Sequence, residues 1–243
     1  MAVSRHVHLA ATIAAELHQR EGRNLVAVGL SGSVARGEER EYSDIDLLVV
    51  VHRKRTWIRH TFRDGILVTI LQQTPEEAHD EVTGSHPGLN DALGGWVSIR
   101  PLYDPSRLLG RLKQRAEKPT AQQFRGAAQQ HFLEAYEDLG KLWNAIEAGD
   151  ADEAREMAIW FSGAAMGVLF DLEGVVLPTG RRAVIELRRR GTLGQSIRRL
   201  RYESMPLAET LQLSEQVWSS LLRRAVRERV PLPAFPRESH GTL

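Results

Sequence analysis

Two aspartates stand one residue apart at the entry to an apolar run. In residues 43–51, SDIDLLVVV, Asp44 and Asp46 flank Ile45 and lead directly into the run. The run predicts a buried strand, and alternation along a strand sends residues i and i+2 to the same face. Two carboxylates on one face repel each other unless a cation lies between them. Paired oxygen ligands suit Mg²⁺, which takes waters and phosphate oxygens for its remaining positions.

A glycine-serine turn precedes this pair. It favours a phosphate-binding site over the alternative, in which an aspartate only caps the turn before the strand. Gly32 and Ser33 follow the apolar run 25–30, and residues 34–36 can begin a helix. Backbone N–H groups, the Ser33 hydroxyl and the Arg36 guanidinium would all face an anion at such a turn. The turn is neither a P-loop nor a dinucleotide motif, because Gly-Lys-Ser/Thr and GxGxxG are missing.

Composition places few limits on the partner but excludes several classes of protein. The chain has 243 residues, of which 42% are hydrophobic and 26% charged, enough to bury a core. It has no cysteine, which excludes disulfides and thiolate metal sites and fits a reducing cytoplasm. No apolar run approaches the roughly 18 residues of a membrane span. The net charge of +1 gives no global field for nucleic acid. We therefore expect neither a membrane nor a nucleic-acid partner.

The order of the expected elements divides the chain in two. In the first half, periodicity and turn signals predict a helix over 4–21, strands over 25–30, 45–51 and 66–71, and a capped helix start at Thr74, and leave 89–99 ambiguous. In the second half they predict helices over 120–147, 152–173, 181–201 and 207–229, followed by a proline-rich, extended tail. The pattern predicts an α+β protein: a domain over 1–117 with a mixed sheet flanked by helices, then an all-α helical bundle over 118–243.

The turn and the carboxylate pair together resemble a known signature. Gly32-Ser33, a short gap, Asp44-Ile45-Asp46 and an apolar strand are similar to the nucleotidyltransferase superfamily related to DNA polymerase β. The segment 102–105, LYDP, and the helices at 131–144 and 158–175 resemble the kanamycin nucleotidyltransferase branch of that superfamily. The resemblance implies an N-terminal nucleotidyltransferase domain joined to a C-terminal helical bundle.

The resemblance also implies roles for particular residues. A nucleoside triphosphate, with ATP the expected one, would lie on the turn, and Mg²⁺ would bind the two aspartates. The reaction would transfer a nucleotide to a hydroxyl of a small molecule, and the resemblance suggests an aminoglycoside. A glutamate of the first bundle helix would be the general base, and a homodimer would complete the site. The candidate residues are Asp44, Asp46 and Glu134 for catalysis, Asp44 and Asp46 for metal, and Gly32, Ser33, Arg36 and Ser43 for nucleotide.

The sequence departs from the family pattern on the strand after the pair. Relatives commonly carry a third carboxylate there, and the aligned residue here is Thr69. The departure weakens the aminoglycoside assignment more than the nucleotidyl-transfer assignment, because a carboxylate-rich pocket suits polycationic sugars. Two other readings stay open: AMPylation of a protein, and a nucleotide-binding module without catalysis. Arg181 and Arg182 either bind triphosphate or pyrophosphate, or form a solvated helix face.

Overall fold

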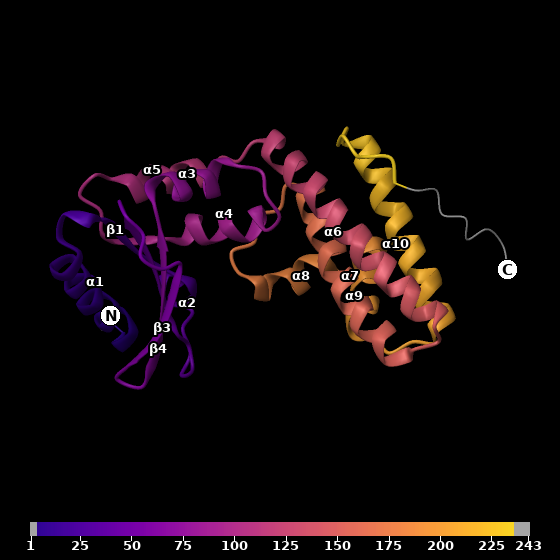
Figure 1. The fold of residues 1–243 in the computed structure, drawn as a ribbon, viewed down its shortest axis with the longest axis horizontal. Helices are drawn as coiled ribbons and strands as arrows, with labels where there is room; N and C mark the ends of the chain where they lie inside the picture. Colours follow the sequence, from indigo (N-terminus) through magenta and orange to yellow (C-terminus); the bar gives the residue numbers. More distant parts are fainter. Residues whose placement is uncertain (1–3, 236–243) are drawn as a thin grey trace. The chain divides into compact units, whose positions relative to one another are not determined.

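The computed structural model describes residues 4–235 and divides into two compact units. The first unit runs to Gln123 and also includes the later segment Val175–Ala183; the second comprises Phe124–Gly174 and the chain from Val184 onward. Figure 1 shows the strands and α1–α5 in the first unit and the long helices α6, α7, α9 and α10 in the second. Within residues 4–235, no helix has the length and apolarity that crossing a bilayer requires. The end of the proline-rich tail, residues 236–243, lies outside the described residues.

The first unit is built on a mixed sheet of five strands in the order β3-β4-β2-β1-β5. The central pair β2 and β4 is parallel, and the other neighbours are antiparallel. The strands are β1 (Leu25–Ser31), β2 (Ile45–Val51), β3 (Ile58–Arg63), β4 (Ile66–Gln73) and β5 (Arg100–Tyr103). The mixed sheet followed by a helical region confirms the predicted fold class. The two edge strands, β3 and β5, were not predicted. Every residue of β3 is exposed or half-buried, so it shows no apolar signal.

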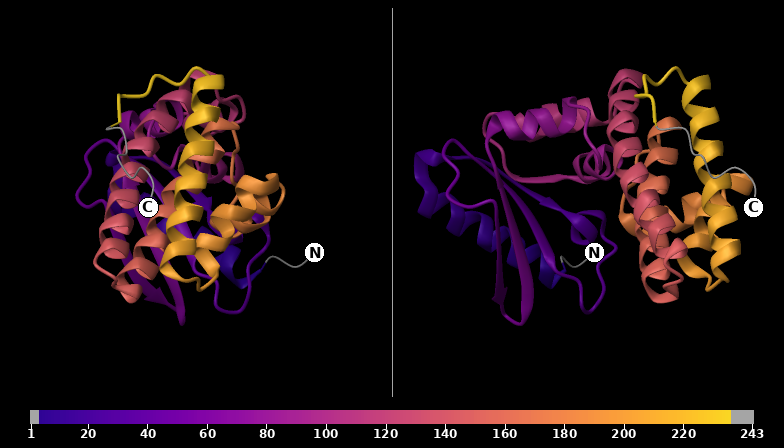
Figure 2. Two further views of the ribbon diagram at one scale, coloured as in Figure 1. Left: turned by 90° about the vertical axis from the view of Figure 1, so that its right-hand side faces the viewer. Right: turned by 45° about the vertical axis from the view of Figure 1, so that its right-hand side comes forward.

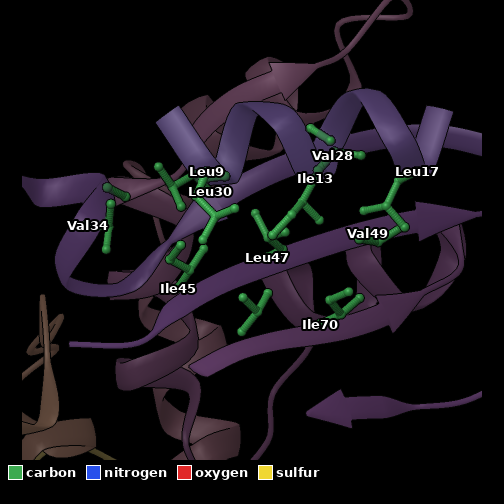
Figure 3. Packing of buried hydrophobic residues seen from close by; sticks show 14 of the residues in the cluster. Leu9, Ile13, Leu17, Val28, Leu30, Val34, Ile45, Leu47, Val49 and Ile70 are labelled. Atoms are coloured by element: carbon green, nitrogen blue, oxygen red, sulfur yellow. The ribbon is translucent and has the colours of Figure 1, made fainter. Parts of the chain in front are cut away.

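Helix α1 (Arg5–Glu21) covers one face of the sheet and forms the main core with it. Its apolar residues Leu9, Ile13 and Leu17 recur at helical spacing and point into the sheet (Figure 3). They meet alternate residues of β2, among them Ile45, which is fully buried. The Ser4 side chain accepts a hydrogen bond from Val7 N and caps the helix. Because Ile45 is committed to this core, its neighbours on β2 must face the opposite side of the sheet.

The opposite face of the sheet carries α3 (Pro75–Thr83), α4 (Leu89–Ser98) and α5 (Leu108–Ala116). Figure 2 shows the strands lying between the indigo α1 and these magenta helices. The predicted helix start at Thr74 is confirmed by a complete capping box with Glu77. The ambiguous segment 89–99 forms α4 up to Ser98, with the apolar residues Leu89, Leu93 and Trp96 buried at helical spacing. Two short helical segments, η1 (Gly22–Asn24) and α2 (Gly32–Arg36), flank β1.

Every regular element in the described residues of the second unit is a helix. It contains most of α6 (Ala121–Glu147), then α7 (Ala151–Leu172), α8 (Ala183–Arg188) without its first residue, α9 (Gly191–Tyr202) and α10 (Leu207–Arg227). The long helices predicted at 120–147, 152–173 and 207–229 are confirmed. The single helix predicted over 181–201 is wrong: the chain forms η2 (Gly180–Arg182), α8 and α9 instead. The break comes at Gly191, whose positive φ of 57° a side chain rarely adopts.

Gly94 of α4 provides a stability test. A Cβ at Gly94 would lie 1.6 Å from the carbonyl oxygen of Leu177, whereas nothing lies within 4 Å of a Cβ at Gly95. Because the obstacle is backbone, we expect Gly94→Ala to lower the free energy of unfolding by about 3 kcal/mol. Gly95→Ala is the control, expected to leave it unchanged or raise it by about 1 kcal/mol through helix propensity. Urea unfolding measures both, and equal effects of the two variants would contradict the packing.

Candidate functional site

The glycine-serine turn and the carboxylate pair touch in the folded chain. Gly32 has a φ of 68°, and a Cβ on it would lie 2.1 Å from Asp46 Oδ2. Only glycine combines this backbone conformation with so close an approach. The Asp46 carboxylate therefore lies directly against the start of α2, where a phosphate and a cation could be held side by side.

Asp46 occupies a half-buried position beside a second negative charge. It follows the buried Ile45 on β2, so its side chain lies on the face opposite α1. Burial raises the pKa of the Asp46 carboxyl, the negative charge of Asp44 raises it further, and Arg36 opposes both. The ionised form of Asp46 is therefore energetically unfavourable in the folded chain, and a bound cation would stabilise it.

Arg36 brings positive charge to the same place. It ends α2, and its Nε donates to Glu38 Oε2 at 2.9 Å. Glu38 in turn donates its backbone N–H to the Ser33 carbonyl oxygen at 2.9 Å. Gly32, Ser33, Arg36 and Asp46 therefore form one cluster, with Asp44 next to it.

Ser43 has a structural role in the loop before β2. Its hydroxyl accepts a hydrogen bond from the Arg40 backbone N–H at 2.8 Å, and its carbonyl oxygen lies 3.1 Å from His6 Nε2. These contacts fix the last turn before Asp44. The hydroxyl proton stays available for a ligand, so the predicted nucleotide contact of Ser43 stays a prediction.

Register across the sheet places three more polar residues in line with Asp46. Asp46 is paired with Ser31 on β1 and with Thr69 on β4, and Thr69 is paired with His60 on β3. His60 Nδ1 and Thr69 Oγ1 share a hydrogen bond of 3.1 Å. Thr69, at the position where the resemblance predicts a third carboxylate, is thus bonded to an exposed imidazole. His60 and Ser31 were missed from the sequence, because only strand register reveals them.

Glu134 lies in the other unit, on α6. Its side chain is 55% exposed, and its Oε2 lies 4.0 Å from His131 Nε2. His131 is itself held from behind, because its Nδ1 lies 2.5 Å from Oδ2 of the buried Asp171. Glu134 therefore lies beside an oriented imidazole one helical turn away.

The donors at the carboxylate pair fit a hard cation that also binds phosphate. Two aspartates, a hydroxyl and backbone groups supply only oxygen and N–H contacts. Within residues 4–235, no group of three or more His, Cys, Asp or Glu side chains could hold a metal ion. Asp44 and Asp46 would thus supply two ligands, and the remaining ligands would be water and phosphate oxygens, a common arrangement for Mg²⁺.

The sheet unit is similar to a known protein domain. Residues 11–93 match the family model of the nucleotidyltransferase domain, from within α1 to within α4. The chain is also similar to the crystal structure of a nucleotidyltransferase-like protein from Exiguobacterium sibiricum 255-15, with a TM-score of 0.63 and 10% sequence identity. That likeness covers 90% of this chain and 76% of the other. A comparison with curated proteins found no match. The predicted nucleotidyltransferase domain and its fold are confirmed, whereas the resemblance to the kanamycin branch stays a prediction.

The raised pKa of Asp46 predicts a pH-dependent stability. Between about pH 4 and the raised pKa, the folded chain binds more protons than the unfolded chain. The stabilising effect of the proton on Asp46 is therefore present at low pH and lost as the pH rises through the raised pKa. As the pH rises through this pKa, we expect the Tm of Asp46→Asn to increase relative to that of the metal-free wild type. Mg²⁺ with ATP should remove this difference in Tm. Calorimetric scans from about pH 3 to pH 7 measure this; a constant difference would contradict it.

Proposed function

We propose that this protein is a Mg²⁺-dependent nucleotidyltransferase that transfers a nucleotide, AMP from ATP, to a hydroxyl of a small molecule. The observation that carries the proposal is the contact of the Asp46 carboxylate with Gly32, beside the negative charge of Asp44. A phosphate-binding turn and a cation-binding pair in contact are what a triphosphate with its metal requires. The match of residues 11–93 to the nucleotidyltransferase domain supports the same conclusion.

In the proposed mechanism, the residues of the sheet unit hold the triphosphate. Gly32 and Ser33 bind phosphate oxygens through backbone N–H groups and the Ser33 hydroxyl, and Ser43 adds a hydroxyl. Asp44 and Asp46 hold Mg²⁺, which supplies charge neutralisation at the phosphates when bound. Arg36 adds a fixed positive charge. Positioning and electrostatic stabilisation carry most of the rate enhancement in such reactions.

The chemical step needs a base for the acceptor hydroxyl. The hydroxyl oxygen attacks the α-phosphorus in line, a phosphorus–oxygen bond forms, and the bond to pyrophosphate breaks. The proton of the hydroxyl goes to Glu134, from this chain or from a second copy in the homodimer that the resemblance implies. Sedimentation equilibrium tests the dimer, and mixing inactive Asp46→Asn with inactive Glu134→Gln chains tests whether two copies complete one site.

The acceptor that we propose to test first is an aminoglycoside. Thr69 and His60 stand where relatives place a third carboxylate, so that side of the site carries less negative charge. Among the aminoglycosides of the panel, those with the fewest amino groups are therefore expected to be the best acceptors.

Pyrophosphate release is the decisive measurement. Purified protein is incubated with ATP or GTP and Mg²⁺, with and without an aminoglycoside panel, beside an Asp44→Asn/Asp46→Asn control. Acceptor-dependent release that vanishes in the control supports the proposal. Release without acceptor, with an AMP adduct on the protein by mass spectrometry, favours protein AMPylation instead. Triphosphate binding without release under any acceptor favours a module without catalysis.

Glu134→Gln tests the proposed base. We expect kcat to fall by about 10²–10³-fold with triphosphate binding unchanged, because general-base catalysis contributes on this scale. The acidic limb of the pH–rate profile should disappear as well. Glu137→Gln is the matched control, since Glu137 lies one turn away on α6 and pairs with Lys141. Equal rates for both variants would exclude Glu134 as the base.

A further inference from the structure

One segment beyond the family match returns to the sheet unit. Val175–Ala183 follows α7 in the chain, yet it belongs to the first compact unit. The backbone N–H of Leu177 donates to the Asn90 carbonyl oxygen of α4 at 3.0 Å, and the Leu177 side chain is buried. The hydrogen bond and the buried side chain fix the segment on α4.

The segment is held at both ends, with two arginines between the fixed points. At one end, the Leu177 carbonyl and Pro178 pack on Gly94, where a Cβ would leave no room. At the other end, Arg182 N donates to the Thr179 carbonyl oxygen at 2.8 Å, and the side chain of Ala183 is buried. Arg181 and Arg182 therefore project from an ordered turn, and both are exposed.

The two arginines lie close to the cluster around the glycine-serine turn. The hydrogen bond from Arg36 lowers the pKa of Glu38, and the positive charges of Arg182 and Arg181 lower it further. Glu38 is bonded through its backbone to Ser33, and α2 packs on α4, which carries the returning segment. One exposed carboxylate beside the proposed phosphate site is thus bonded to Arg36 and lies within the electrostatic reach of Arg181 and Arg182.

The positive charge of Arg36, Arg181 and Arg182 is not balanced by the single carboxylate of Glu38. Glu38 is already paired with Arg36, and neither Arg181 nor Arg182 makes a salt bridge with a carboxylate of residues 4–235. Guanidinium groups match phosphate oxygens in geometry and stay charged at any working pH. An anion with several phosphate oxygens is the ligand that such a cluster fits best.

We propose that Arg181 and Arg182 bind the β- and γ-phosphates of the nucleoside triphosphate, and the pyrophosphate that leaves. The inference rests on the proposed function and adds a subsite from outside the matched domain. Glu38 competes with the phosphates for the arginines and keeps their charge partly neutralised in the empty site. An arginine pair on a merely solvated helix face would have no such preference for the distal phosphates.

Binding measurements with three ligands test the assignment. The probes are ATP, AMP and inorganic pyrophosphate, each with Mg²⁺, titrated calorimetrically into the full chain. For Arg181→Gln/Arg182→Gln we expect ATP and pyrophosphate affinity to fall at least about tenfold and AMP affinity to stay within about twofold. Glu38→Gln is expected to raise ATP affinity, and to do so less in the Arg181→Gln/Arg182→Gln background.

Arg188→Gln/Arg189→Gln is the control, because Arg188 ends α8 and Arg189 follows it, and both are exposed arginines of the second unit. It removes the same charge from the chain and should leave all three affinities unchanged. Thermal unfolding of each variant establishes that it is folded.

The outcomes separate this inference from the proposed function. If wild type binds ATP and the variant at Arg181 and Arg182 binds it equally well, the subsite is wrong and the proposed function stands. An equal loss of ATP and AMP affinity also overturns the subsite, because AMP lacks the distal phosphates. If wild type binds no triphosphate, both proposals are overturned.

Discussion

Asp46→Asn is expected to lower the rate of pyrophosphate release by about a thousandfold, without weakening the fold. The carboxylate is a proposed cation ligand at the centre of the cluster, and removal of one preorganised electrostatic contact costs about 10²–10³ in rate. Asparagine has nearly the same shape but cannot neutralise a divalent cation. Because burial and Asp44 raise the pKa of Asp46, the neutral side chain should leave the metal-free protein as stable as wild type or more so at neutral pH.

The combination of lost activity and retained stability is the informative result. Single-turnover kinetics measure the rate, and thermal unfolding without metal measures the stability. Asp80→Asn is the control, since Asp80 is an exposed aspartate on α3 of the same unit. A variant at Asp46 that keeps activity within about tenfold would show that the pair does not hold the reacting metal.

Gly32→Ala is expected to lower activity by about a hundredfold. Its effect on the free energy of unfolding should be little larger than that of an alanine at another glycine with a similar φ. The new Cβ would lie 2.1 Å from Asp46 Oδ2, the movable end of a side chain, so the carboxylate rotates away and the backbone stays. Displacement of a reacting group by about 1 Å can cost on the order of 10² in rate.

Gly37→Ala separates this displacement from backbone strain. Gly37 has a φ of 69°, almost equal to the 68° of Gly32, but nothing lies within 4 Å of its Cβ. Both variants should lose about 1 kcal/mol from strain in the left-handed region, and only Gly32→Ala should lose activity. Urea unfolding measures the loss of stability, and pyrophosphate release measures the activity. Equal activity of the two variants would mean that the contact with Asp46 is not needed.

The sequence alone determined the elements with strong local signals. The strand carrying Asp46 could be recognised because its apolar run is continuous, as burial on both faces requires. Helices α6, α7 and α10 could be predicted because each has an apolar face within one stretch of chain that breaks bound. The chemistry proposed for the turn and the carboxylate pair could be predicted for the same reason: the residues lie close together in sequence.

Tertiary structure alone decided the features that depend on distant parts of the chain. The exposed strand β3 has no apolar pattern of its own, so the pairing of His60 with Thr69 emerges only from sheet register. The return of Val175–Ala183 to α4 depends on Gly94, a helix glycine whose purpose shows only when the Leu177 carbonyl packs against it. Local sequence encodes periodicity and turn geometry, whereas contacts between segments some eighty residues apart arise from packing, which no local pattern records.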